Sequence, residues 1–220
     1  MSRRRSDYKI NNAIFRVEYG DITGVMADVL VSSDDSHLSM GGGVSASLLR
    51  AGGDMIAQEA HKHVPLGLGD VAVTSAGKLH ARYIFHVVTI DFKNLSYASA
   101  ETLKLATSRC LELADTLGCR TIAFPALGTG VAGVPFHVAA ETMTRKITDY
   151  LYDDTRLQMI TLTLLARENV RDKDLNMFYE RSVALATLAT QSRRLTSLFD
   201  ELSRIVNVQK QPALLLKEDR

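Results

Sequence analysis

The 220-residue sequence contains no tryptophan and only two cysteines. Neither Cys110 nor Cys119 belongs to a C-x-x-C or histidine-rich pattern, so both are interpreted as core thiols, and no metal or cofactor is expected. The 26 basic and 25 acidic side chains nearly cancel, which gives no electrostatic reason to expect nucleic acid or an anionic membrane as a partner. No apolar run approaches the roughly 18 residues of a membrane span, and no signal-peptide pattern opens the chain. A cytoplasmic protein without a membrane partner is therefore expected.

Six apolar runs have the length of a β-strand: residues 13–19, 28–33, 71–76, 83–90, 121–127 and 159–166. Segments of helical period lie between them, most clearly at residues 103–117 and 136–151. Strands that are apolar on both faces need helices above and below them. The pattern predicts the α/β class: a three-layer α/β/α sandwich around a mixed, largely parallel six-stranded sheet. His86 lies in one of these strands and is interpreted as a hydrogen-bonded core residue rather than a metal ligand.

The two ends of the chain differ from this pattern. Residues 1–9 are rich in arginine and lysine and are expected to form a basic, solvated tail before a domain of residues 10–180. Residues 181–220 are expected to form a helical extension and a tail. A long C-terminal helix is predicted beyond about residue 173, with an apolar seam interrupted by Gln191 and formed by Leu188, Leu195, Leu198, Leu202 and Ile205. The seam could pack on its own domain, pair with a second copy or contact another protein.

Two glycine-rich segments follow predicted strands. Gly41, Gly42 and Gly43 precede a predicted helix, and residues 124–135 contain a second set of glycines before Pro135. Glycine lets main-chain N–H groups approach a phosphate closely, and a following helix adds the positive end of its dipole. Two such loops can hold a diphosphate, although a glycine-rich structural turn would look the same. Neither loop has the Gly-Lys-Ser/Thr ending of a Walker motif, and the second lacks the position of a dinucleotide-binding Rossmann loop.

The order of short motifs carries a family resemblance. These motifs are GDIT at 20–23, VSSDDSHLSMGGGVS at 31–45, AGG at 51–53, GDVAVTSAGKLHARYIFHVV at 69–88 and PALGTGVAGVP at 125–135. Over residues 10–180 the chain resembles the macro domain, of the ADP-ribose-binding type that includes ADP-ribose 1″-phosphate-processing members. The resemblance implies a mixed sheet between helices and a cleft for ADP-ribose between the two glycine-rich loops.

The resemblance also implies a set of ligand-binding residues. Asp21 matches the acid that accepts a hydrogen bond from the adenine amino group, with the Ile22 backbone beside it. Ser33 and Asp35 lie where the family has part of its Asn-Ala-Ala-Asn motif, and Asp35 takes the position of the asparagine that touches the distal ribose. The first diphosphate loop matches Gly41, Gly42, Gly43, Val44 and Ser45. The second matches Gly128, Thr129, Gly130 and Val131, followed by Ala132.

Several of these positions depart from the family pattern. Ser45 replaces the aspartate of the hydrolase branch, and Ala132 replaces an aromatic residue of the second loop. Arg167 lies near the place of an aromatic residue that stacks on adenine, and its planar guanidinium could stack instead. Asp35 could accept from ribose hydroxyls, act as a general base on a water molecule, or cap its own loop.

Three functions fit these residues. The first is a module that binds ADP-ribose, a related NAD-derived nucleotide diphosphate or an ADP-ribosylated protein. The second is an enzyme that hydrolyses an ADP-ribosyl ester, O-acetyl-ADP-ribose or a terminal phosphate, with Asp35 as the candidate catalytic residue. The third and weakest is a nucleic-acid binder that holds a terminal or unstacked base.

Overall fold

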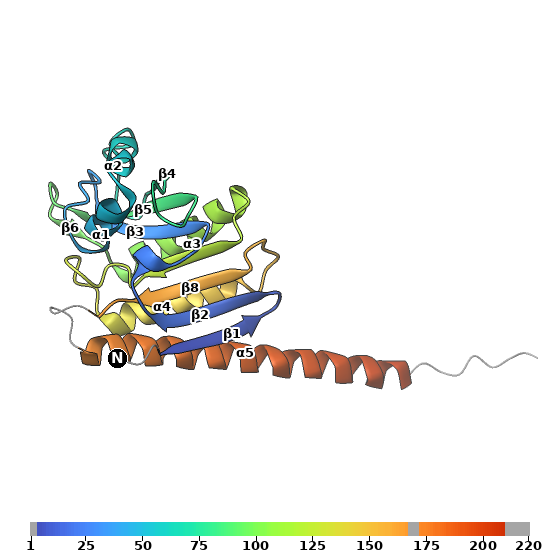
Figure 1. The fold of residues 1–220 in the computed structure, drawn as a ribbon. Helices are drawn as coiled ribbons and strands as arrows, with labels where there is room; N and C mark the ends of the chain where they lie inside the picture. The colour runs from blue at the N-terminus through green and yellow to red at the C-terminus, as the bar shows by residue number, and fades with distance from the viewer. Residues whose placement is uncertain (1–3, 167–171, 210–220) are drawn as a thin grey trace, which may run out of the picture.

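The computed structural model describes residues 4–166 and 172–209, of which residues 205–209 are described without their side chains. A mixed sheet of eight strands forms its middle layer (Figure 1). The strands are β1 (Arg5–Ile10), β2 (Ala13–Tyr19), β3 (Val29–Asp35), β4 (Val71–Ser75), β5 (Tyr83–Asp91), β6 (Ser96–Tyr97), β7 (Thr121–Pro125) and β8 (Met159–Leu164). Their order is β1-β2-β8-β7-β3-β5-β4, and β6 pairs with β5. The central strands β2, β8, β7, β3 and β5 are mutually parallel, whereas β1, β4 and β6 pair antiparallel with their neighbours.

Helices cover both faces of the sheet, so the predicted three-layer α/β/α fold is confirmed. The short helix η1 (Ile22–Gly24), α1 (Gly43–Gly52) and α2 (Met55–Ala60) lie on one face. The opposite face is covered by α3 (Ala100–Thr116), α4 (Phe136–Tyr150) and the first part of α5 (Asp172–Gln209). The larger hydrophobic core lies under α3 and α4 and includes both cysteines, which are buried and unpaired. None of the described helices is long and apolar enough to cross a bilayer.

All six predicted strands are present, but the count of six was wrong because two further strands complete the sheet. Strand β1 occupies most of the segment expected to be a solvated tail. Its residues alternate, with Tyr8 and Ile10 toward the core and the charged side chains toward solvent. The carboxylate of Asp7 accepts two hydrogen bonds from the guanidinium of Arg5 and two from that of Arg16, its partner on β2. Arg5 and Lys9 thus belong to an edge strand. The other missed strand, β6, is only two residues long.

Helix α5 has two parts with different surroundings. Its first part packs on α4, β1 and β2 through the buried residues Leu175, Phe178, Tyr179, Ser182 and Ala186. Thr144 of α4 donates a hydrogen bond of 2.9 Å to Ser182, and the ring of Tyr19 on β2 lies 5.4 Å from that of Tyr179. From residue 191 to residue 204 every side chain except Ser203 is exposed. Residue 180, the expected end of the domain, therefore falls inside one continuous helix.

Candidate functional site

The topology brings the expected ligand-binding segments to one edge of the sheet. Because β2, β8, β7 and β3 run parallel, their carboxyl ends lie along the same edge. Helix η1 follows β2, the first glycine-rich loop follows β3, and the second follows β7. This edge is where open α/β sheets bind their ligands.

A small hydrophobic cluster places η1 beside the first glycine-rich loop. Ile22 of η1 is buried together with Met40, Leu48 of α1 and Ala123 of β7. This packing positions Asp21, the residue before η1, although its own side chain is exposed. The Asp21 carboxylate accepts a hydrogen bond of 3.0 Å from the main-chain nitrogen of Thr23 and so caps η1. The expected adenine-binding acid is thus held in a defined place at the carboxyl edge.

The first glycine-rich loop is open to solvent. Gly41, Gly42 and Gly43 are exposed, and a Cβ atom added at Gly42 or Gly43 would meet no heavy atom within 4 Å. Gly43 has a φ of 60°, in the region that favours glycine. Helix α1 begins here with Gly42 as its N-cap, so the positive end of the helix dipole lies at this loop. Val44 packs against the cluster around Ile22 and fixes the loop to the domain.

Ser45 and Ser33 make hydrogen bonds within the protein. Ser45 is buried, and its hydroxyl donates to the carbonyl oxygen of Gly42 at 2.8 Å. Ser33 is half-buried, and its hydroxyl lies 2.8 Å from that of Thr89 on β5. Ser45 therefore stabilises the start of α1.

Asp35 caps the turn between β3 and the first glycine-rich loop. Its Oδ1 accepts from the main-chain nitrogen of His37 at 2.9 Å and, more weakly, from that of Ser39 at 3.4 Å. Its Oδ2 accepts a short hydrogen bond from the Ser39 hydroxyl. A carboxylate has about four lone-pair sites. The hydrogen bonds within the turn thus leave the Asp35 carboxylate able to accept a further hydrogen bond from a ligand hydroxyl.

The second glycine-rich loop is braced internally and exposed at its tip. Gly128 has a φ of 72°, and a Cβ atom there would lie 3.1 Å from Leu103 of α3. Val134 donates a main-chain hydrogen bond to the Gly128 carbonyl at 2.9 Å, and the Thr129 hydroxyl donates to Ala126 at 2.8 Å. The tip itself, Gly130 and Val131, is exposed, whereas Ala132 packs on the larger core. Arg167, the remaining expected ligand residue, lies outside the described residues.

One buried polar network was not anticipated from the sequence. Asp34 and His86 are both buried, and the Nδ1 atom of His86 lies 3.0 Å from Oδ2 of Asp34. Ser32 donates to the same oxygen at 2.6 Å, and Nε2 of His86 lies 3.0 Å from the Thr74 hydroxyl. The interpretation of His86 as a hydrogen-bonded core residue is confirmed. Side chains alternate along β3, so Ser32 and Asp34 lie on the same face of the sheet. This two-residue spacing is the feature of the sequence that could have predicted their contact.

Two surface hollows lie away from the carboxyl edge of the sheet. One is lined by residues around Asp28 and His80 at the opposite, amino-terminal edge of the strands, and another lies between α4 and α5. Among the described residues, no group of three or more histidine, cysteine, aspartate or glutamate side chains is arranged to hold a metal ion. The candidate site is therefore an open edge built from loop main chain, with carboxylates at Asp21 and Asp35.

Comparison with proteins of known sequence identifies close relatives. An uncharacterized protein of Sulfolobus acidocaldarius is 40% identical over 148 residues, which cover 65% of this chain and 80% of that protein. An uncharacterized protein of Aquifex aeolicus is 39% identical over 135 residues, covering 61% of this chain and 81% of its own length.

Comparison with solved structures finds macrodomains. The Oceanobacillus iheyensis macrodomain, solved with ADP, matches with a TM-score of 0.74 and 25% identity, over 84% of this chain and 98% of its own. The Trypanosoma brucei macrodomain in complex with ADP-ribose shares the fold, with a TM-score of 0.66 and 21% identity over 76% of this chain and 68% of its own. The family model of the macro domain matches residues 31–143 of the sequence. With its fold and these relatives, the chain belongs to the macro domain family.

Proposed function

We propose that this protein binds ADP-ribose or a related NAD-derived nucleotide diphosphate, free or linked to a protein. The observation that carries the proposal is the meeting of Asp21 and the two glycine-rich loops at one carboxyl edge of the sheet. A structurally similar macrodomain was solved with ADP, and another that shares the fold was solved in complex with ADP-ribose.

Each part of the ligand has a chemically suitable partner in this arrangement. The Asp21 carboxylate accepts from the adenine amino group, and the Ile22 main chain lies beside the base. The diphosphate lies on the main chain of residues 41–45 and 128–132, where exposed glycines permit close approach. The distal ribose lies near Ser33 and Asp35. An ADP-ribosylated protein would enter from the distal ribose side.

Binding is favoured over hydrolysis by the hydrogen bonds at the distal ribose end. The buried hydroxyl of Ser45 donates to Gly42, and the Asp35 carboxylate accepts three hydrogen bonds from the turn that it caps. A general base must reach the proton that it removes, and a carboxylate engaged by three turn bonds is better suited to holding a hydroxyl in place. The loop also carries Ala132 instead of an aromatic ring. A binding module that holds ADP-ribose without turning it over fits these features best.

Calorimetry with ADP-ribose tests the proposal, with one valine variant in each glycine-rich loop. Gly42 and Gly130 are exposed, neither has a positive φ, and a Cβ atom at either would meet nothing within 4 Å. We therefore expect Gly42→Val and Gly130→Val to fold normally while their side chains occupy the diphosphate position. Each should weaken ADP-ribose binding by about tenfold or more, a loss of about 1.4 kcal/mol. His80→Val, on an exposed loop at the opposite edge, should bind as the wild type does.

Two results would contradict the proposal. One is the absence of binding heat from the folded wild-type protein at millimolar ADP-ribose. The other is unchanged affinity in both glycine variants. Release of ADP-ribose from a modified protein, abolished by Asp35→Ala but retained in Ser45→Ala, would instead establish the hydrolase.

A further inference from the structure

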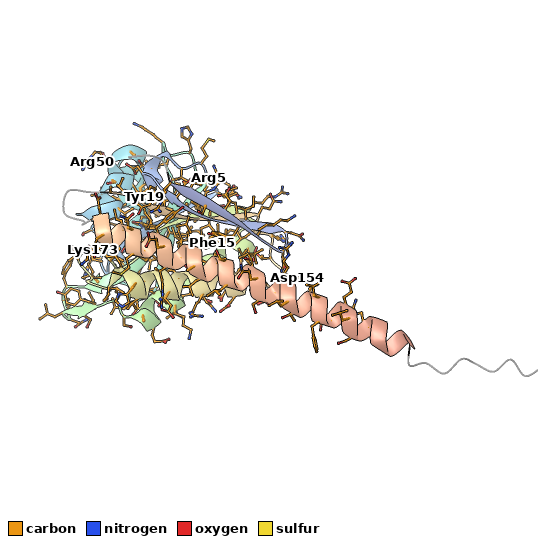
Figure 2. All side chains as sticks on the ribbon, turned by 90° about the horizontal axis from the view of Figure 1, so that it is seen from below. Arg5, Phe15, Tyr19, Arg50, Asp154 and Lys173 are labelled. Carbon is orange, nitrogen blue, oxygen red and sulfur yellow. The ribbon has the colours of Figure 1, made fainter. Side chains whose placement is uncertain are left out.

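The second half of α5 extends beyond the rest of the molecule. Figure 1 shows the helix continuing past the sheet and past every other helix, and Figure 2 shows the same from below, with Lys173 at the end that lies against the domain. The first part packs on α4, β1 and β2, whereas the residues from 191 to 202 are all exposed, and of these Arg193 still lies over the ring of Tyr152. In proteins most of the stability of a helix comes from the packing of its apolar face.

The second half of α5 carries an apolar seam that Gln191 interrupts. Leu188, Leu195, Leu198 and Leu202 are exposed by 61%, 69%, 54% and 60% of their surface, and Phe199 beside them by 72%. The leucines follow the three-and-four spacing of a coiled-coil seam, with Gln191 in the remaining seam position. Leu195 follows the buried Ala186 by about two and a half turns, so it lies on the opposite side of the helix. The domain to which α5 is attached therefore does not cover the seam around Leu195, whereas Leu188, at the near end of the seam, borders the hollow between α4 and α5.

We propose that the seam binds a second copy of this chain, with the two α5 helices antiparallel. Leu195 then packs against Leu198 of the second copy, and Gln191 packs against Leu202 of the second copy. Because the seam faces away from the attached domain, the second helix meets no obstruction from it. The two domains lie at opposite ends of the paired helices.

Charge complementarity selects this orientation. In the antiparallel register, Arg194 lies beside the seam opposite Glu201 of the second copy, and twofold symmetry repeats the pair. Charged residues at these flanking positions set the partner and the orientation of coiled coils. In a parallel pair Arg194 would lie beside Phe199 of the second copy, with no carboxylate opposite it. The charges that flank the seam are thus complementary when the two helices are antiparallel, and not when they are parallel.

Sedimentation equilibrium of the full chain tests the proposal at low salt, over concentrations from about 1 μM to about 500 μM. We expect reversible dimers that Leu195→Asp with Leu198→Asp abolishes. Arg194→Glu and Glu201→Arg should each raise the dimer dissociation constant by about tenfold or more, because each creates two like-charged pairs. The double variant Arg194→Glu with Glu201→Arg should restore dimerisation. Arg204→Glu makes the same charge change on the far side of the helix and serves as the matched control.

Disulfide formation provides a second readout of orientation, since Cys110 and Cys119 are buried. Gln191→Cys with Leu202→Cys should oxidise to a covalent dimer, whereas Gln191→Cys alone should not. A monomer at every concentration, failure of the charge swap to restore pairing, or efficient crosslinking of Gln191→Cys alone would each overturn the proposal. None of these variants touches the carboxyl edge of the sheet. Calorimetry with ADP-ribose on the same samples therefore distinguishes failure of pairing from failure of ligand binding.

Discussion

The carboxylate of Asp35 lies 2.9 Å from the main-chain nitrogen of His37 and holds the turn that leads into the first glycine-rich loop. The same side chain accepts from Ser39, two residues before Gly41. One acidic residue thus shapes the loop and lies at the end of the strand where the distal ribose is expected. Its structural role and its ligand-binding role can be separated by mutation.

Asp35→Ala should lower ADP-ribose affinity by about fivefold, since losing the turn hydrogen bonds costs about 1 kcal/mol in loop ordering. Asp35→Asn keeps one acceptor oxygen and should lose less. Calorimetry gives the affinities, and hydrogen exchange should show faster exchange at residues 36–40 in Asp35→Ala. Unchanged exchange in that variant would show that the carboxylate does not order the turn.

Asp21→Asn should change base selectivity while leaving η1 capped, because asparagine also caps helices. A carboxylate accepts from the adenine amino group but repels the O6 acceptor of hypoxanthine. We expect the wild type to prefer ADP over IDP by about tenfold or more, and the variant to reduce this preference to about twofold. Titration calorimetry with both nucleotides measures the ratio. An unchanged ratio of the ADP and IDP affinities would show that Asp21 does not contact the adenine.

His86→Leu should lower the free energy of unfolding by about 3 kcal/mol, because it removes one of the two side chains that hydrogen-bond the buried Asp34 carboxylate. The double variant Asp34→Leu with His86→Leu should lose less than the two single variants summed, since neither polar group is then left alone. Urea denaturation measures all three, with the exposed His63→Leu as control. Strict additivity would mean that the two residues do not act as a pair.

Acid should selectively weaken the attachment of β1. Hydrogen bonds from Arg5 and then from Arg16 hold the pKa of the Asp7 carboxyl well below its usual range. A carboxyl whose pKa is lowered in the folded state contributes stability above its unfolded pKa of about 3.9 and loses it as the pH falls further. Asp7→Asn should therefore be less stable than the wild type by about 1 kcal/mol at pH 7, a difference that shrinks progressively below about pH 4.

Thermal unfolding at a series of pH values tests this expectation, with Asp154→Asn in an exposed loop as control. Asp7 is partly exposed, so solvent screens its ion pairs and the effect stays small. A difference between wild type and Asp7→Asn that grows as the pH falls would contradict the assignment.

The sequence by itself determined six of the eight strands, the sandwich class and the family, because continuous apolar runs and ordered glycine motifs are local signals. It also indicated that His86 belongs to the core. It did not reveal β1, whose charged residues are typical of a solvated tail. Arg5 and Arg16 become structural only when pairing of β1 with β2 brings both to Asp7, and that contact is not local.

Tertiary structure decided how the local signals combine. The parallel order of β2, β8, β7 and β3 brings loops from distant parts of the chain to one edge, and no single loop contains that information. The same holds for α5: heptad spacing predicts a seam, but only packing through Ala186 determines that the seam faces away from the domain. Periodicity along the chain defines which faces of an element are apolar, whereas the position of each element relative to its neighbours decides which of those faces become buried.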